Sequence, residues 1–375
     1  MIERIETLKT APEIGAEQIA LLEKLSNAVA VSGDEGEVRQ IVLNEIRPYA
    51  DEVKVDALGN VLVTVHPQNR DAKRSARQQH LGQPLKVMVD AHMDEVGFML
   101  VEAGEEGLFC FETVGGIDVR QLVGKAVWVG KEHVPGVIGA KPIHHTTPEE
   151  RKNTIPLDAL RIDLGPAGGS KAKVGDRATF ATQFAQVGPS LRGKALDNRL
   201  GVATLIELVK HAPANIELQA AFTVQEEVGL RGARVAAYAF NPDLAIAIDS
   251  TPAVDLPTWD DSENSVYNCR LDFGPAIYLA DAGTLADPRL VRHLVATAEA
   301  LHIPYQFRQP GGGGTDAGAI HKQRAGIPSI SVSVPGRYAH TAVLMARLAD
   351  WQATLGLVYQ ALVRLPADIL SLPRE

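Results

Sequence analysis

A change of pattern along the chain limits its possible folds more than any other feature. Up to about residue 100, and again from about residue 190, short apolar segments typical of buried strands are mixed with segments of helical apolar spacing. Between them the chain is β-like and rich in glycine, with no long helical pattern. Alternating strands and helices favour a mostly parallel sheet covered on both faces. We therefore predict an α/β domain whose sequence is divided by a β-rich insertion of about 90 residues.

The individual elements follow from apolar periodicity, caps and turns. Residues 16–29 have helical spacing, and Ser32 is expected to cap the next helix. Residues 53–65 are expected to form two strands joined by a turn, and the basic residues 69–83 an exposed loop. After the insertion we expect helices over 196–212, 232–240, 287–303 and 348–365, and strands from residue 217, over 243–249 and over 327–336.

Composition and charge exclude several classes of protein. The 375 residues are 45% hydrophobic and 22% charged, as in an ordinary globular protein. Lys and Arg number 37 against 46 Asp and Glu, a net charge of -9, so we expect no nucleic-acid partner. No run approaches the ~20 apolar residues of a membrane span, so we expect no membrane partner. The first ten residues do not resemble a secretory signal, and two distant cysteines fit a reducing compartment, so we expect a cytoplasmic protein.

Residues of the kinds that bind metals follow the predicted strands. His92 and Asp94 come at the end of an apolar strand, and residues two apart on a strand point to one side. One ring nitrogen of His92 could then bind a metal while Asp94 accepts the proton of the other. Taken alone, this pair is more often a surface or capping pair.

Four further residues lie after predicted strands. Glu226 and Glu227 follow one strand, Asp249 ends another, and His340 follows a third. Ligands of open α/β sheets bind at the carboxyl ends of strands. Adjacent strand side chains face opposite ways, so the two glutamates can serve one site only where the chain has left the strand. Each residue alone is also consistent with an ordinary exposed turn.

Asp197 opens the helix predicted over 196–212. An Asp followed by Asn at a helix start is most often an N-cap, but a carboxylate can also bridge two metal ions. Two histidines and three carboxylates suit a pair of divalent ions, whose charge they leave partly uncompensated. The set is His92, Asp197, Glu227, Asp249 and His340.

Six ordered segments closely resemble the M42 family of metalloaminopeptidases, which includes glutamyl-aminopeptidase-like and tetrahedral (TET) peptidases. The resemblance covers nearly the whole chain. It implies a three-layer α/β/α dinuclear-metal peptidase domain, formed by residues 1–100 and 190–375. A small β-barrel or PDZ-like domain for assembly would be inserted over 101–189. The segments are DAHMDEVGF, KALDNRLGVA, TVQEEVGLRGA, AIDS, GGGGTDAGAI and VPGRYAHT.

The resemblance also implies residue roles. Asp197 would bind both metal ions, one together with His92 and Asp249, the other together with Glu227 and His340. Asp94 would orient His92, Glu226 would be the general base, and a cis peptide would join Asp197 to Asn198. The metals would be two divalent ions, with zinc or cobalt best suited to these ligands.

The resulting hypothesis is an aminopeptidase that hydrolyses N-terminal residues from peptides with a water activated by two metals. Its partners would be peptides with a free N-terminus and other copies of itself, as a dimer-based homo-oligomer and possibly a dodecamer. The glycine-rich segment 311–318 lacks the lysine of a phosphate-binding loop. We expect its Thr315 and Asp316, together with Arg337, on the substrate side.

Three alternatives remain open at this point. The same metal site could serve another amide hydrolase, such as a deacylase or carboxypeptidase. A glycosidase would need two carboxyls flanking a sugar bond, whereas Glu226 and Glu227 are adjacent, and it would leave the histidines without a role. A non-catalytic assembly protein would be expected to lack some of the ligands.

Overall fold

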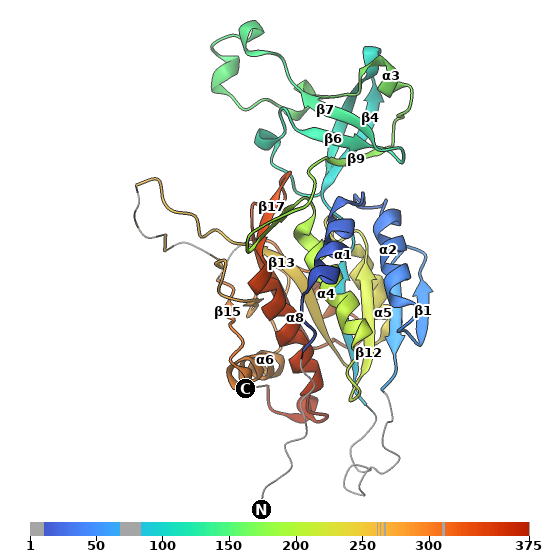
Figure 1. Cartoon of the computed structure of the whole chain (residues 1–375), viewed down its shortest axis with the longest axis vertical. Coiled ribbons are helices and arrows are strands. Elements are labelled where there is room, and N and C mark those ends of the chain that lie inside the picture. The colour runs from blue at the N-terminus through green and yellow to red at the C-terminus, as the bar shows by residue number, and fades with distance from the viewer. Residues whose placement is uncertain are drawn as a thin grey trace, which may run out of the picture.

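The computed structural model describes residues 11–67, 84–260, 262, 264–265, 268–309 and 312–374. It consists of a large part with helices and strands and a smaller all-β part at one end, joined by narrow connections (Figure 1). The basic segment 69–83 and the first ten residues lie outside the described residues. Among the helices that the structure describes, none combines the length and apolarity that a membrane span requires.

The predicted helices and strands outside the insertion are all present, with ends that differ by a few residues. The helices are α1 (Ala16–Asn27), α2 (Gly36–Ile46), α3 (Gly165–Gly169), α4 (Leu196–Lys210), α5 (Arg231–Phe240), α6 (Pro288–Leu301), α7 (Ala317–Ile320) and α8 (Leu348–Val363). The strands are β1 (Glu52–Val55), β2 (Val61–Val65), β3 (Lys86–His92), β4 (Gly97–Ala103), β5 (Leu108–Val114), β6 (Ala126–Val129), β7 (Val134–Gly139), β8 (Arg161–Asp163), β9 (Arg177–Phe180), β10 (Ala185–Val187), β11 (Ser190–Gly193), β12 (Glu217–Thr223), β13 (Leu244–Pro252), β14 (Ala276–Ile277), β15 (Gln306–Phe307), β16 (Ser329–Arg337) and β17 (Leu344–Arg347).

The large part is built on one eleven-stranded sheet. Its order is β1-β2-β12-β3-β13-β16-β17-β11-β10, with β14 paired to β16 and β15 paired to β14. The central strands β12, β3, β13 and β16 are parallel, whereas the strands toward both edges run antiparallel. The expectation of a mostly parallel sheet is therefore correct only for the centre. The edge pairs β1–β2 and β10–β11 are hairpins, which need no helical crossover and must be antiparallel.

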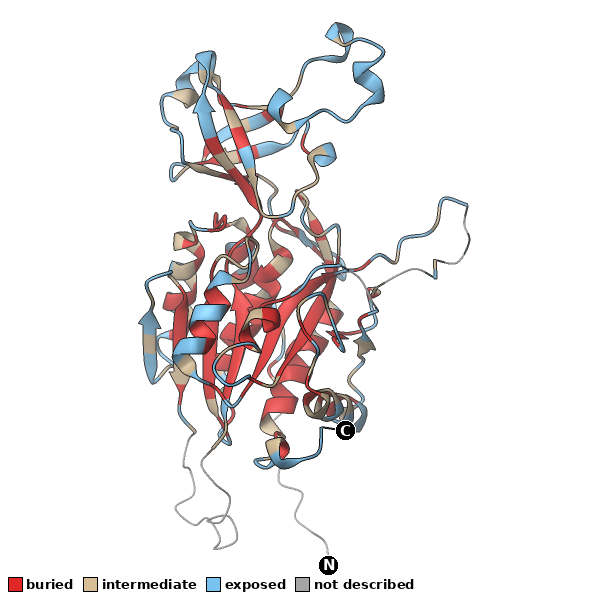
Figure 2. Cartoon of the chain, turned by 180° about the vertical axis from the view of Figure 1, so that it is seen from behind, coloured by how far each residue is buried: buried red, intermediate tan, exposed pale blue. Residues whose placement is uncertain are grey.

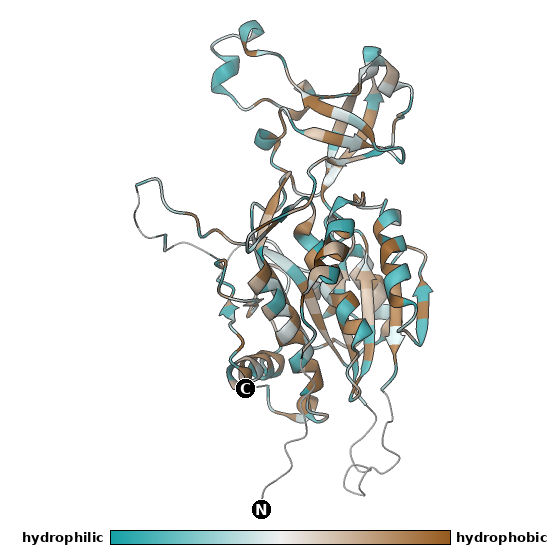
Figure 3. Ribbon diagram, viewed as in Figure 1, coloured by the Kyte–Doolittle hydropathy of each residue, from teal (hydrophilic) through white to brown (hydrophobic). Residues whose placement is uncertain are grey.

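Hydrophobic side chains pack on both faces of this sheet. Along β3, Val87 and Val89 belong to the larger core, which includes most of α4, whereas Met88 between them belongs to a smaller core with α5. This alternation is the two-residue period of a strand with apolar neighbours on each side. The central strands are the most continuously buried part of the molecule (Figure 2) and are predominantly hydrophobic (Figure 3).

The smaller part is a closed β-barrel of strand order β4-β5-β8-β7-β6-β9. Phe98 in its core makes edge-to-face contacts with Phe111 and Phe180, with 5.2 Å between ring centroids in each pair. In the stretch 101–189, where the sequence shows no long helical pattern, the longest α-helix is α3 with five residues. The sequence pattern therefore predicted the β character of this part.

Ser32 does not cap the second helix. α2 begins at Gly36, with Glu35 in the N-cap position, and the Ser32 hydroxyl donates instead to Asp94 Oδ2 at 2.6 Å. The prediction was wrong because it considered only the residues that follow Ser32 in the chain. The folded molecule brings a buried carboxylate from the end of β3 within reach, and a charged acceptor makes the stronger hydrogen bond.

Candidate metal centre

His92 is the last residue of β3 and is only 2% exposed. Its Nε2 lies 3.3 Å from Asp249 Oδ1 and 3.5 Å from Asp197 Oδ1. Its Nδ1 lies 3.2 Å from the backbone carbonyl oxygen of Asp94 and 3.5 Å from Asp94 Oδ1. A proton on Nδ1 that is shared with Asp94 leaves the Nε2 lone pair directed at the two other carboxylates.

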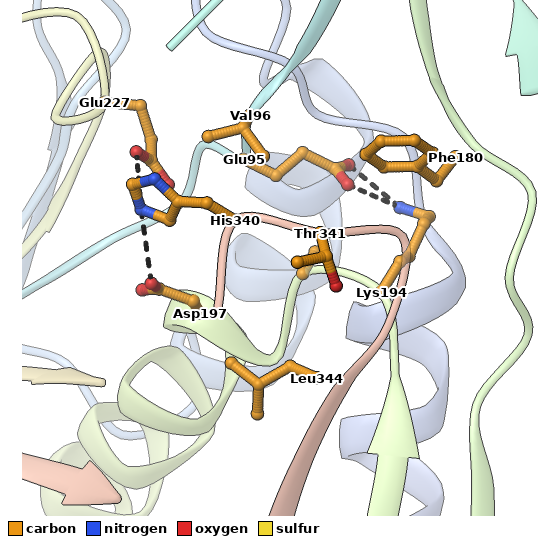
Figure 4. Close-up of a pocket in the computed structure, with 10 residues that line it drawn as sticks. Glu95, Val96, Phe180, Lys194, Asp197, Glu227, His340, Thr341 and Leu344 are labelled. Carbon is orange, nitrogen blue, oxygen red and sulfur yellow. Dashed lines mark hydrogen bonds and ion pairs between the residues drawn. The ribbon is translucent and has the colours of Figure 1, made fainter. Parts of the chain in front are cut away.

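Asp197 lies between the two histidines. Its Oδ1 faces His92, and its Oδ2 lies 3.7 Å from His340 Nε2. The same nitrogen of His340 is 3.3 Å from Glu227 Oε2, so the imidazole sits between two carboxylates (Figure 4). The Asp197–Asn198 peptide bond is cis, as the resemblance implies. The interpretation of Asp197 as an N-cap is wrong, because its oxygens face the two histidines. The side chain that accepts a backbone N–H at this helix start is that of Asn198, whose Oδ1 accepts from Gly201 at 3.0 Å.

Asp249 was expected to end its strand, but β13 continues through Pro252. The strand is longer because its pairing with β16 continues as far as Gly336. The Asp249 side chain is nevertheless 8% exposed and faces His92. A polar residue inside a strand can therefore face the same site as residues at strand ends.

The loop after β12 carries the two glutamates. β12 ends at Thr223 and Gln225 has a φ of 57°, so the chain has left the strand before it reaches Glu226. The backbone N–H groups of Glu226 and Glu227 donate to the two oxygens of Asp94, at 3.0 and 3.2 Å. Both side chains can therefore turn toward the histidines, which a regular strand would prevent.

Among the residues that the structure describes, two groups of three side chains could hold a metal ion. One is His92, Asp197 and Glu227, and the other is His92, Glu226 and Asp249, with the ligand atoms of each group within 4.8 Å of one another. Imidazole nitrogens and carboxylate oxygens are common ligands of divalent transition metals. The groups share His92, so the cluster forms one continuous centre rather than two separate sites.

The electrostatics of the cluster also fit bound cations. Burial raises the pKa of Glu227 to about 8 and that of Asp249 to about 6. Burial, with Asp249 nearby, raises the pKa of Glu226 well above its usual range. Burial alone would lower the pKa of His92, but the charge of Glu226 and contacts with Asp197 and Asp249 raise it well above the usual value. Buried carboxylates crowded in this way are stabilised by divalent cations, so the donor set fits the implied metals.

A buried ionic network lies behind the centre and was not foreseen from the sequence. Glu95, which follows Asp94, accepts hydrogen bonds from Lys194 Nζ on both oxygens at 2.9 Å and pairs with Arg199 at 3.3 Å. These three side chains are at most 3% exposed. Thr179 on β9 of the barrel donates to the same carboxylate at 2.8 Å. The only sequence signal is a second acid after the strand, and its partners lie far away in the chain.

A cleft of about 680 Å³ opens beside the two histidines. Its lining includes the glycines 312–314 and two residues that the sequence did not single out, Tyr278 and Arg308. On the other side of His340 lies a narrow hollow, bordered by Lys194 and the hydrophobic residues labelled in Figure 4. The large cleft is therefore the space in which a substrate can reach the candidate ligands.

The three residues expected on the substrate side do not line this cleft. Thr315 is 1% exposed and its hydroxyl lies 2.6 Å from that of Ser331. Asp316 is also buried and accepts a hydrogen bond from Thr223. Arg337 donates to Asp255 at 2.6 Å. Their role toward the substrate remains a prediction. The neighbouring glycines 312–314 line the cleft instead.

Comparisons with known proteins agree with the resemblance seen in the sequence. The M42 glutamyl aminopeptidase family matches residues 75–357. A putative aminopeptidase of Acetivibrio thermocellus is 34% identical over 91% of this chain and 97% of its own length. The lysyl aminopeptidase of Pyrococcus furiosus is 29% identical over 93% of this chain and 98% of its own. The TET1 peptidase of Pyrococcus horikoshii, which can assemble into a tetrahedron or a large octahedral shell, is 32% identical, has a TM-score of 0.78, and aligns over 93% of this chain and 100% of its own.

Proposed function

Since this chain belongs to the M42 glutamyl aminopeptidase family and is a hydrolase of the aminopeptidase type, we propose that it removes N-terminal residues from peptides at two divalent metal ions. The position of Asp197 carries this proposal. Its two oxygens face two different histidines, His92 and His340. A carboxylate in that position can bridge two ions. His92 and His340 do not occur together in either of the two groups of described residues that could hold a single ion, so one ion would not account for both histidines.

The proposed ligands divide into two sets that share Asp197. His92 and Asp249 complete one set, and Glu227 and His340 complete the other. Zinc or cobalt suits these nitrogen and oxygen donors. When bound, the two ions polarise the scissile carbonyl and lower the pKa of a water molecule.

Glu226 is the proposed general base. It belongs to the group with His92 and Asp249, and burial raises its pKa, which makes the carboxylate a stronger base toward a nearby water. The same carboxyl would then deliver the proton to the leaving amine. Asp94 is a positioning residue, because it binds the backbone of both glutamates and lies beside the Nδ1 of His92.

The finer description of the architecture also belongs to the proposal. Cores on both faces of the sheet support a three-layer α/β/α catalytic domain over the expected residues 1–100 and 190–375, apart from residues 97–100, which belong to the barrel strand β4. The closed barrel supports an inserted domain over 101–189, and its likeness to a PDZ domain remains a prediction. The ability of the TET1 relative to form closed shells supports a homo-oligomer, dimer-based or dodecameric.

The decisive test combines metal supply, substrate type and one ligand variant. Purified protein is stripped of metal, loaded with zinc or cobalt, and assayed with aminoacyl anilides and with their N-acylated counterparts. The proposal expects chelator-sensitive hydrolysis of the free-amine substrates only. Cleavage of the N-acyl bond of the N-acylated substrates alone would support the alternative of a deacylase.

The variant for this test is Asp197→Asn. It should lose bound metal, measured by elemental analysis, as well as activity, because a neutral amide does not bridge two cations. Glu112→Gln, at an exposed position of the barrel strand β5, is the matched control and should keep both. Full metal content in Asp197→Asn would contradict the proposed bridging role.

A further inference from the structure

The cleft beside the metal centre contains a buried arginine that has no ionic partner among the described residues. Arg308 follows β15, is 6% exposed, and lines the cleft. Within the part of the chain that the structure describes, no carboxylate oxygen lies within ion-pair distance of its guanidinium. Burying a charge without a counter-charge is costly, so such a group is typical of a site for an anion.

Other contacts fix the orientation of this guanidinium. Its Nε donates to Thr251 Oγ1 at 3.2 Å, and its Nη2 donates to the carbonyl oxygen of Gly312 at 2.6 Å. The ring of Tyr278 lies 4.8 Å from the guanidinium carbon. The remaining nitrogen, Nη1, is buried and has no hydrogen-bond partner among the residues described. Arg308 therefore presents an immobilised, unused donor of a planar cation, the geometry that suits a carboxylate.

The distance from the metal centre indicates which carboxylate this donor could reach. Thr251, which anchors Arg308, lies two residues beyond Asp249 on β13. Two residues along a strand span roughly 6.6 Å, with both side chains on one face. Tyr278 lies close enough to Asp249 for its pKa to be affected, after the larger effect of burial. A side chain of the length of glutamate therefore spans the space between the candidate ligands and Arg308.

The glycine-lined wall next to Arg308 leaves room for such a side chain. A Cβ atom added at Gly312 or Gly313 would meet no atom within 4 Å, so these positions border open space. Leu230 and Ala282 add apolar lining. An acidic side chain could enter this space without displacing protein atoms. Its carboxylate would lose contacts with water and gain a contact with the Arg308 guanidinium.

We propose that Arg308 is a specificity-determining residue that binds the side-chain carboxylate of an N-terminal glutamate or aspartate. The inference rests on the proposed aminopeptidase function and names its substrate class. An N-terminal lysine would place a second positive charge beside Arg308 and would be rejected. Family membership does not decide this point, because the Pyrococcus furiosus relative is a lysyl aminopeptidase.

The test compares metal-loaded wild type, Arg308→Met and Arg308→Lys on the p-nitroanilides of glutamate, glutamine, leucine and lysine. Glutamate and glutamine have nearly the same shape, so the ratio of their kcat/KM values isolates the charge. We expect wild type to favour glutamate, Arg308→Met to lower this ratio by about 10- to 100-fold, and Arg308→Lys to keep part of it. Arg324→Met is the matched control, because Arg324 also stacks on a tyrosine and donates to a carbonyl oxygen but is exposed and lies outside the cleft. It should leave the ratio unchanged.

Two results would overturn the assignment. One is equal cleavage of the glutamate and glutamine anilides by wild type. The other is an equal loss on all four anilides in Arg308→Met at unchanged melting temperature, which would indicate a structural role. A carboxylate at the other end of a short peptide is tested separately with Leu-Gly and its C-terminal amide. A preference for the free acid that disappears in Arg308→Met would place that carboxylate at Arg308 instead.

Failure of the proposed function would look different. In that case metal-loaded wild type would cleave none of the anilides. Calorimetric titration with L-glutamate and L-glutamine still tests Arg308, since binding needs no turnover. Tighter binding of glutamate that is lost in Arg308→Met supports the carboxylate site, and equal binding of the two amino acids contradicts it.

Discussion

Asp94 Oδ1 accepts a hydrogen bond from the backbone N–H of Glu226, with 3.0 Å between the two atoms. The second oxygen of Asp94 accepts the N–H of Glu227 and the hydroxyl of Ser32. Burial raises the pKa of this carboxyl, but contacts with His92, Ser32 and the loop outweigh burial and lower it. Asp94 therefore holds the loop of the proposed base as well as approaching the histidine.

Replacing Asp94 with Asn should weaken both the hold on the Glu226 loop and the contact with His92. The amide presents an N–H where the loop also presents N–H groups, so at least one of three hydrogen bonds is lost. We expect metal affinity to fall about 10- to 100-fold, measured by competition with a chromogenic chelator. Ser32→Ala removes one donor and keeps the carboxylate, so its effect should be smaller. Equal effects of the two variants would contradict the loop-holding role.

Replacing Glu226 with Gln should separate metal binding from turnover. The amide keeps the size of the side chain but cannot accept the proton, so kcat should fall by about 10²- to 10⁴-fold. Metal content should remain, because the proposed ligand sets do not need this residue. Steady-state kinetics with elemental analysis of the same sample check both statements. Near-normal kcat would remove Glu226 as the base.

Metal binding should depend on pH through two carboxyls. In the metal-free chain, burial raises the pKa of Glu227 to about 8 and that of Asp249 to about 6. Below these values a metal must displace protons, so affinity should rise as the pH rises from 6 to 8. Chelator competition at pH 6, 7 and 8 measures this slope. An affinity that stays constant over this range would show that neither group binds metal.

Replacing Glu95 with Gln should destabilise the fold. It would leave Lys194 and Arg199 buried without their carboxylate, which costs about 3–5 kcal/mol in the free energy of unfolding. Glu150→Gln, the exposed partner of Lys141, is the control and should change little. Urea unfolding monitored by circular dichroism compares them, and equal midpoints would contradict the network's importance.

The same network should contribute to acid unfolding. Burial raises the pKa of Glu95, but Lys194 and Arg199 outweigh burial and hold it below its usual value near 4.5. A carboxyl with a lowered pKa stabilises the fold above its unfolded-state pKa and loses this contribution as the pH falls through its folded-state pKa. Wild type should therefore lose more stability than Glu95→Gln when the pH falls below about 4.5, measured by melting temperature across pH.

The chain should assemble with copies of itself. Several barrel residues expose hydrophobic side chains, including Ile143 at 65% and Val174 at 53%. Light scattering after size exclusion should give a mass that is a multiple of 40.2 kDa. Ile143→Lys tests whether the barrel takes part, since a charge at an apolar contact disfavours association. A wild type that elutes as a monomer would contradict assembly.

Local patterns in the sequence were sufficient for most of the architecture. Apolar periodicity located the helices and central strands, and its loss indicated a β-rich stretch between them. The edge strands were harder, because the antiparallel pairing of β11 with β17 joins two segments that lie far apart in the chain. The strand carrying Asp249 was predicted too short, because its length depends on a neighbouring strand far along the chain.

The sequence alone determined which residue types are available and which of them lie at or near the predicted strands and helix starts. These identify a candidate set of His92, Asp197, Glu227, Asp249 and His340. Their distances to one another, the hydrogen bonds of Asp94 to the loop of Glu226, and the isolated charge of Arg308 were decided only by the tertiary structure. The physical reason is the separation along the chain of the residues that interact. Helix and strand patterns arise from side chains a few residues apart, whereas burial and charge pairing depend on segments that meet only after the chain has folded.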